Sequence, residues 1–124
     1  MIFRMKNALT AAAVLVTALM SQQALAHAHL ASASPASKAE VSDSPKELTL
    51  AFTEGVEAGF SGVSVTGADG KTVATGKATV DAADSKVLHI PLSSELKAGD
   101  YRVDWHVLSV DGHKTKGMYH FSVK

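Results

Sequence analysis

Residues 101–107 read YRVDWHV, and residues 119–123 near the C-terminus read YHFSV. In both stretches large apolar side chains alternate with polar ones, which is the period of a β-strand with one buried face. The same alternation recurs in residues 48–52 and 88–92, and residues 60–65 suggest one more strand. The chain is therefore predicted to be built from strands.

The last two predicted strands can be aligned by matching apolar side chains with apolar side chains. This alignment places Trp105 opposite Phe121, and His106 opposite His120 on the outer face. It leaves residues 108–118 as the connection between the strands. We expect the two histidines to be solvated, because no acidic residue accompanies the pair. A slip of one residue would exchange the two faces of the strands.

The segments between the strands contain turn signals that bear on the fold class. Asp69-Gly70 is typical of a hairpin turn, because both residues tolerate the positive φ angles that such turns require. No stretch after the first 26 residues shows a sustained helical period. The predicted fold is all-β, an antiparallel sandwich or small barrel. Its expected core consists of Leu48, Leu50, Phe52, Val63, Leu88, Ile90, Val103, Trp105, Phe121 and Val123.

The first 26 residues follow the order of segments found in a secretory signal peptide. Two basic residues, Arg4 and Lys6, precede an apolar-rich stretch over residues 8–20, and small residues end the segment at Ala26. A membrane anchor is the competing interpretation, but the stretch is shorter than the roughly 20 residues that span a bilayer. We therefore expect a signal peptide over residues 1–26, cleavage after Ala26, and one exported domain that does not span a membrane.

The composition of residues 27–124 excludes several classes of function. Loss of Arg4 and Lys6 leaves ten basic and twelve acidic residues with no basic cluster, which argues against nucleic acid or an anionic membrane surface as a partner. The chain has no cysteine, so thiolate metal sites and thiol catalysis are excluded. Met118 is the one methionine left after cleavage, which is too few for a thioether cluster that binds Cu(I).

Cleavage after Ala26 would make His27 the first residue of the exported chain. Its α-amine and its imidazole can then bind one metal ion as a chelate. The pKa of an α-amine is about 7.7–8.0, so a metal ion can displace its proton near neutral pH. Nitrogen ligands in a tetragonal arrangement favour Cu(II). The alternative is a loose chain end that binds nothing.

Asp111 and His113 form the second candidate, in the sequence Asp111-Gly112-His113. Residues two apart on an extended segment point to the same side, so a carboxylate and an imidazole could converge there on a metal ion. The alternative is a turn aspartate beside a solvated histidine, because Asp-Gly is common in turns. The spacing alone leaves both open. His89 stands alone on an outward face and is expected to be structural or inert.

Several short motifs occur in one order along residues 27–124. They are His27, Leu30, Ser32, SPA at 34–36, LTLAFTE at 48–54, FSG at 60–62, AGDYRVDW at 98–105, SVDGH at 109–113, Gly117 and FSVK at 121–124. In this combination they resemble the CopC family of copper-binding proteins of the bacterial periplasm, most closely its YobA-like members. The resemblance implies an immunoglobulin-like Greek-key barrel of about seven strands. It also implies a Cu(II) site made of the amine and imidazole of His27 with Asp111 and His113, and an acidic residue near the metal, which Glu54 matches.

Two departures from the family pattern bear on copper. Some members carry a methionine-rich loop with a histidine that binds Cu(I), whereas residues 66–83 contain neither Met nor His, so no Cu(I) site is expected. Some members have proline at the second position, where this chain has Ala28. The tripeptide His27-Ala28-His29 therefore offers an amine, two amide nitrogens and an imidazole, a local Cu(II) chelate that proline would interrupt. We favour the site across the fold, which ionises no amide, with His29 as a candidate supporting ligand.

These observations predict a periplasmic Cu(II)-binding protein, with one ion per chain, that buffers or carries copper in copper homeostasis or resistance. The resemblance suggests a CopD-type inner-membrane copper protein as its partner. We expect no enzymatic activity. One alternative is an oxidase with copper held by the N-terminal histidine, as in polysaccharide monooxygenases, but its flat substrate face is not expected here because the aromatic residues are assigned to the core. The other is a metal-free, immunoglobulin-like adhesion or assembly module, which would leave the Asp-x-His pairing unexplained.

Overall fold

The computed structural model describes residues 28–124, so the predictions about the leader and about His27 lie outside the described residues. Residues 28–124 form nine β-strands and one short 3-10 helix, η1, and the predicted all-β class is confirmed. In chain order the elements are β1 (Leu30–Ser34), β2 (Glu40–Val41), β3 (Glu47–Phe52), η1 (Ala58–Phe60), β4 (Gly62–Gly67), β5 (Thr72–Val73), β6 (Thr79–Val80), β7 (Val87–Pro91), β8 (Gly99–Leu108) and β9 (Lys114–Val123). Within this described part, no helix is long and apolar enough to cross a membrane.

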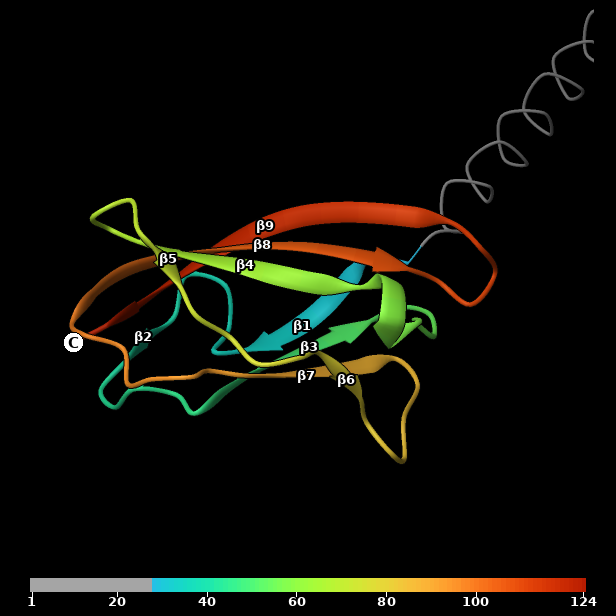
Figure 1. The fold of residues 1–124 in the computed structure, drawn as a ribbon, viewed down its shortest axis with the longest axis horizontal. Helices are drawn as coiled ribbons and strands as arrows, with labels where there is room; N and C mark the ends of the chain where they lie inside the picture. Colours follow the sequence, from blue (N-terminus) through green and yellow to red (C-terminus); the bar gives the residue numbers. More distant parts are fainter. Residues whose placement is uncertain (1–27) are drawn as a thin grey trace, which may run out of the picture.

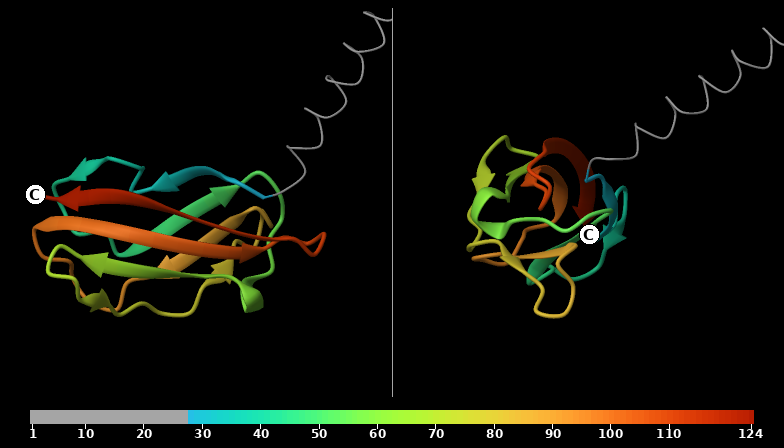
Figure 2. Two further views of the ribbon diagram at one scale, coloured as in Figure 1. Left: turned by 90° about the horizontal axis from the view of Figure 1, so that it is seen from above. Right: turned by 90° about the vertical axis from the view of Figure 1, so that its right-hand side faces the viewer.

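The strands form two sheets that face each other as a sandwich (Figure 1, Figure 2). The four-stranded sheet has the order β1-β3-β7-β6, and the five-stranded sheet has the order β2-β9-β8-β4-β5. Neighbouring strands pair antiparallel, apart from β2 and β9, which are parallel. Nine strands are described where about seven were expected, and three of the nine, β2, β5 and β6, have two residues each.

Apolar side chains between the two sheets form a single core. The residues predicted for the core are all buried except Val63, which is half-buried and packs against the others. Trp105 meets Phe52 edge to face, with ring centroids 5.2 Å apart, and Tyr101 stacks on Phe121 at 5.5 Å. Aromatic pairs of this kind stabilise a fold by about 0.5–1.5 kcal/mol beyond the burial of their surface.

Phe60 departs from the sequence prediction. It belongs to η1 and not to a strand, and 70% of its surface is exposed. The helical turn forms because the N–H groups of Phe60 and Ser61 donate to the carbonyl oxygens of Glu57 and Ala58, each at 3.2 Å. The predicted strand is therefore wrong at Phe60, which is not among the predicted core residues. The other aromatic side chains of the described residues are all buried, as expected: Phe52, Tyr101, Trp105, Tyr119 and Phe121.

The predicted register between β8 and β9 is wrong by four residues. Trp105 lies opposite Gly117, and Phe121 lies opposite a residue earlier in β8 than predicted. The strands pair as far as Leu108 and Lys114, so the connection between them is shorter than expected. The Trp105 ring occupies the space beside Gly117, where a Cβ atom would lie 2.5 Å from Cζ2 of the ring. Because the shift is even, the buried and exposed faces stay as predicted.

The two strand histidines are exposed on the outer face as predicted, but they do not form a pair. His106 lies opposite Lys116, and His120 lies opposite Arg102. Arg102 in turn donates to the carboxylate of Asp104 at 2.9 Å. The arrangement of two facing histidines is therefore excluded by the register.

The predicted Asp-Gly hairpin turn is confirmed between β4 and β5. Gly70 has a φ of 80°, a left-handed conformation that glycine adopts easily. The N–H of Gly67 donates to the carbonyl of Lys71 at 3.0 Å, and the N–H of Lys71 donates to the Asp69 carboxylate at 3.0 Å. These bonds close the turn with the residue types that the sequence pattern requires.

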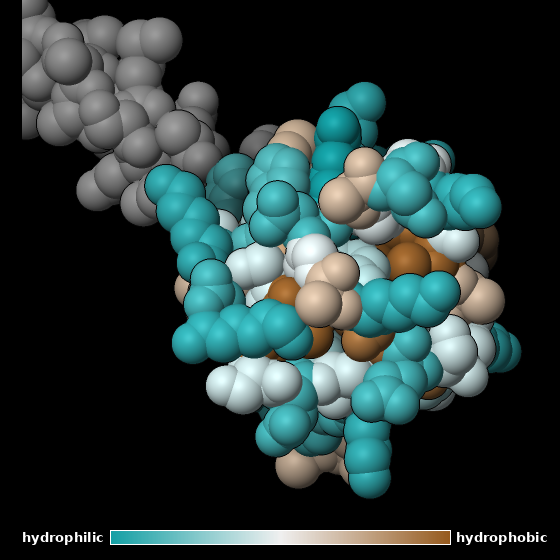
Figure 3. Space-filling view, turned by 90° about the vertical axis from the view of Figure 1, so that its left-hand side faces the viewer, coloured by the Kyte–Doolittle hydropathy of each residue, from teal (hydrophilic) through white to brown (hydrophobic). Residues whose placement is uncertain are grey.

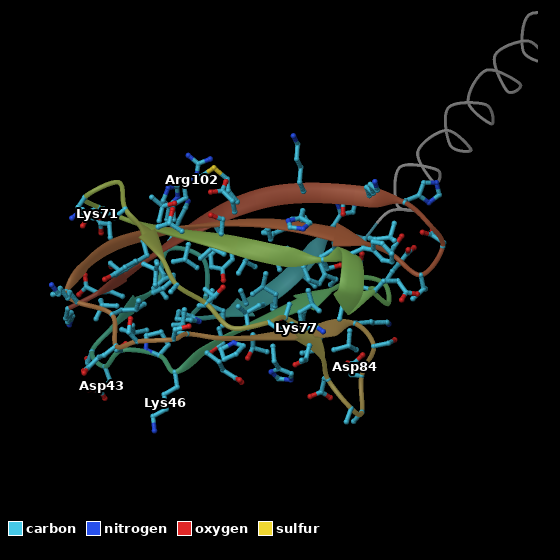
Figure 4. The ribbon with its side chains drawn as sticks, viewed as in Figure 1. Asp43, Lys46, Lys71, Lys77, Asp84 and Arg102 are labelled. Atoms are coloured by element: carbon cyan, nitrogen blue, oxygen red, sulfur yellow. The ribbon has the colours of Figure 1, made fainter. Side chains whose placement is uncertain are left out.

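Charged side chains lie on both sides of the sandwich. Arg102 lies on the outer side of the five-stranded sheet, whereas Lys46 and Asp84 lie on the side of the four-stranded sheet (Figure 4).

In the view onto the end that carries the C-terminus, hydrophilic side chains surround smaller hydrophobic areas (Figure 3). A pocket lined in part by residues 42–46 and Lys124 lies there. The β8–β9 loop, which carries the candidate ligands Asp111 and His113, is at the opposite end of the molecule (Figure 1).

Candidate metal centre

Three segments that are far apart in the sequence meet at the end of the sandwich opposite the C-terminus (Figure 1). They are the β8–β9 loop of residues 109–113, the segment 53–57 after β3, and the start of the described chain at Ala28. An N–H of the loop donates to the carbonyl of Gly55 at 2.9 Å. The hydroxyl of Thr115 donates to the carbonyl of Ala28 at 2.8 Å. The first contact joins the loop to the segment after β3, and the second joins Ala28 to β9 directly after the loop.

The β8–β9 loop is a tight turn closed by its own backbone. The N–H of Ser109 donates to the carbonyl of His113, and the N–H of Gly112 donates to the carbonyl of Ser109, both at 2.9 Å. Gly112 has a φ of 91°, which a residue with a side chain adopts only under strain. The turn brings the side chains of Asp111 and His113 to within 3.1 Å of each other, Oδ1 to Nδ1.

Ser109 organises this turn from its buried side. It is a polar residue with 1% of its surface exposed. Its hydroxyl donates to the carboxylate of Asp111 and accepts the backbone N–H of His113 at 3.2 Å. Sequence reasoning missed this role. The signal that could have revealed it is a serine two residues before the aspartate of the Asp-x-His turn.

The carboxylate of Asp111 is held in its ionised form. The hydroxyl of Ser109, and then the imidazole of His113, lower the pKa of Asp111 from 3.8 to about 2. The side chains of Asp111 and His113 are 41% and 54% exposed. The pair therefore presents an anionic oxygen and an imidazole together to solvent, which is the donor chemistry of a site for a divalent metal ion.

Replacing Ser109 by alanine tests this arrangement. Ser109→Ala should raise the pKa of Asp111 in the metal-free protein, because the largest stabilisation of the carboxylate is lost. The variant should also lower the free energy of unfolding by about 1 kcal/mol, since the buried hydroxyl no longer bonds the backbone of His113. An NMR pH titration of Asp111 measures the first effect, and urea unfolding measures the second. Ser64→Ala, on an exposed position of β4, is the control, and an unchanged pKa in Ser109→Ala would contradict the assignment.

The two candidate supporting residues lie beside the loop. Glu54 is half-buried, and it directly precedes Gly55, whose carbonyl accepts the hydrogen bond from the loop. His29 is exposed. Its backbone N–H donates to the hydroxyl of Thr53 at 2.9 Å, and its carbonyl accepts the N–H of Thr53 at 2.9 Å. Both residues thus belong to the same end of the molecule as Asp111.

The structure brings together two of the three principal ligands predicted from the sequence. Asp111 and His113 are in contact, and His27 lies outside the described residues, next to Ala28 in the chain. Among residues 28–124, no group of three or more His, Cys, Asp or Glu residues is arranged to hold a metal ion. The role of the three residues as one metal site stays a prediction.

His89 is structural, but it is neither alone nor inert. Its Nε2 lies 2.7 Å from the carboxylate of Asp81, and its Nδ1 lies 3.2 Å from the carboxylate of Glu47. The hydrogen bond with Asp81, and to a lesser extent that with Glu47, raises the pKa of His89. Because a carboxylate faces each ring nitrogen, His89 on β7 links β3, through Glu47, to the residue after β6, Asp81, by hydrogen bonds.

Comparisons with known proteins match this chain to the same family. The family model described as CopC domain matches residues 30–124. Protein YobA of Escherichia coli K12 is 51% identical over 114 residues, which cover 92% of this chain and 92% of that protein. Copper resistance protein C of Xanthomonas campestris pv. juglandis is 32% identical over 127 residues, which cover 98% of this chain and 99% of that protein.

A solved structure has the same fold. The crystal structure of CopC from Methylosinus trichosporium OB3b matches with a TM-score of 0.74 and a sequence identity of 39%. The match covers 79% of this chain and 94% of that chain. The two-sheet architecture is therefore shared with a protein of known structure. The loop that carries Asp111 and His113 lies within residues 30–124, which the family model matches.

Proposed function

Because the chain belongs to the CopC family, we propose that it is a periplasmic protein that binds one Cu(II) ion and buffers or carries copper. The observation that carries this proposal is the contact of an ionised Asp111 with His113 on a loop next to the anchored start of the described chain. Relatives at 32% and 36% identity are named copper resistance protein C, which supports copper as the ion.

The anchoring of Ala28 supports His27 as the missing ligand. The carbonyl of Ala28 is bonded to Thr115, which follows His113 by two residues, and Ala28 itself is fully buried. Consecutive Cα atoms are about 3.8 Å apart, so His27 begins one residue away from this fixed point. The matched family region begins at residue 30, so the proposal for His27 rests on this anchoring and on the cleavage expected after Ala26.

The proposed ligand set favours Cu(II) over other ions. It consists of the amine and imidazole of His27, the imidazole of His113 and the carboxylate of Asp111. Three nitrogens and one oxygen suit a tetragonal Cu(II) ion, which also has the highest affinity of the common divalent metals. Glu54, half-buried beside the loop, adds negative charge that favours a cation.

Exposure of Asp111 and His113 is consistent with a role in carrying copper. The side chains of Asp111 and His113 lie partly in solvent, where an acceptor protein can approach the ion directly. The acceptor that we propose is an inner-membrane copper protein of the CopD type, and we propose no enzymatic activity.

A Cu(II) titration of residues 27–124 tests the proposal. We expect His113→Ala to weaken Cu(II) binding by about a hundredfold, equal to about 2.8 kcal/mol, because one of four ligands is lost. Electron paramagnetic resonance should report one nitrogen ligand fewer in the variant. His120→Ala removes an exposed histidine on the outer face of β9 and serves as the matched control. Equal affinity of His113→Ala and the unmodified chain would overturn the proposed site.

A further inference from the structure

A second way of binding Cu(II) competes with the proposed site at the same chain end. In the tripeptide His27-Ala28-His29, the amine, two backbone nitrogens and the imidazole of His29 can surround one Cu(II) ion in a plane. Both backbone nitrogens become ligands in that complex, and their two protons leave to solvent. The peptide group between Ala28 and His29 must then turn its nitrogen toward the metal, so its existing contacts decide whether this complex can form.

That peptide group is bonded at both of its polar ends in the structure. Its carbonyl oxygen, on Ala28, accepts the hydroxyl of Thr115 at 2.8 Å. Its N–H, on His29, donates to the hydroxyl of Thr53 at 2.9 Å. Thr53 also donates its own N–H to the carbonyl of His29 at 2.9 Å, which continues the pairing of β1 with β3.

The two threonines come from different sheets. Thr53 follows β3 in the four-stranded sheet, and Thr115 lies in β9 of the five-stranded sheet. The peptide group therefore bridges the two sheets at this end of the sandwich. Ala28 has no exposed surface and packs with the core, so turning the peptide would also withdraw its methyl group from the interior.

We propose that Thr53 and Thr115 form a clamp on the Ala28–His29 peptide that prevents the tripeptide complex and directs Cu(II) to His27, Asp111 and His113. The clamp determines the mode of binding without contacting the metal. This inference rests on the proposed function, since it requires an exported chain that begins at His27. It also assigns the His29 imidazole no role as a ligand while the clamp is intact.

The first test removes the two hydroxyl groups and keeps the shape of the side chains. In residues 27–124 carrying Thr53→Val and Thr115→Val, we expect at least about a tenfold rise in the fraction of Cu(II) bound in the tripeptide mode. The synthetic peptide His-Ala-His with a free amine gives the reference spectra in electron paramagnetic resonance and visible absorption. Thr66→Val with Thr72→Val, a facing pair of threonines on β4 and β5, is the matched control.

A second substitution identifies the ligand that changes. His29→Ala should alter Cu(II) affinity less than about twofold in the unmodified chain, but about tenfold or more when the clamp is absent. Thr53→Ser with Thr115→Ser keeps both hydroxyl groups and should behave as the unmodified chain. A spectrum of the unmodified chain equal to that of the peptide would overturn the clamp, as would a clamp-free variant whose binding is independent of His29.

A measurement without copper separates this inference from the proposed function. Amide hydrogen exchange of His29 in the metal-free protein should be at least about tenfold faster in the valine variant than in the serine variant, because the N–H has lost its acceptor. Equal exchange rates would overturn the clamp, and this result does not depend on where copper binds. Loss of dependence on His113 with a protected His29 amide would instead overturn the proposed copper site and leave the clamp standing.

Discussion

A single glycine placed before His27 is expected to weaken Cu(II) binding by about a hundredfold or more, equal to at least about 2.8 kcal/mol. The added residue converts the α-amine into an amide, which no longer binds the metal without losing a proton. The free amine then belongs to the glycine, one residue farther from Ala28, so the chelate formed by the amine and the imidazole of His27 itself is lost from the site with Asp111 and His113. Isothermal titration of residues 27–124 with and without the glycine measures the difference.

The control for this prediction is a glycine added after Lys124, at the end of the molecule away from the β8–β9 loop. This addition should leave the affinity unchanged. Combining the N-terminal glycine with His113→Ala should cost less than the sum of the two separate losses, because both changes disrupt one shared site. If the extended chain binds Cu(II) as tightly as the chain that begins at His27, and His113→Ala weakens binding equally in both, the amine of His27 is not a ligand.

The fold class could be predicted because the pattern of buried side chains has the period of a strand. Alternation in β3, β7, β8 and β9 identified the buried faces, and the apolar residues assigned to them do form the core. Alternation could not determine the register of β8 on β9, because a shift by four residues preserves both faces. The register depends on the fit of the Trp105 ring against Gly117, which is a property of packing.

The candidate site could be predicted only where its residues are close in sequence. Asp111 and His113 could be expected to lie close together because they are two residues apart, and the structure shows the contact between their side chains. The role of Ser109 depends on its burial, and the clamp joins Ala28 to Thr115 across 87 residues of chain. The contacts of His89 likewise come from Glu47 and Asp81 in other segments. Such contacts require the folded chain.

Gly117 is expected to tolerate no side chain. Gly117→Ala should lower the free energy of unfolding by about 3 kcal/mol, because overpacking forces side chains and backbone to shift. The new Cβ would lie 2.5 Å from Cζ2 and 2.8 Å from Cε2 of the Trp105 ring. The ring is itself confined by Phe52, at 5.2 Å between centroids. Urea unfolding measures the loss. Gly59→Ala is the matched control, because a Cβ there meets nothing within 4 Å, and it should change stability by less than about 1 kcal/mol.

A double-mutant cycle separates the clash with the ring from any effect on the backbone of β9. Trp105→Leu alone leaves a cavity and should cost about 3 kcal/mol. In that background Gly117→Ala should cost little, because the new methyl group enters the space that the ring has left, which gives a coupling of about 2–3 kcal/mol. An equal cost in both backgrounds would show that the backbone, and not the ring, excludes a side chain at Gly117.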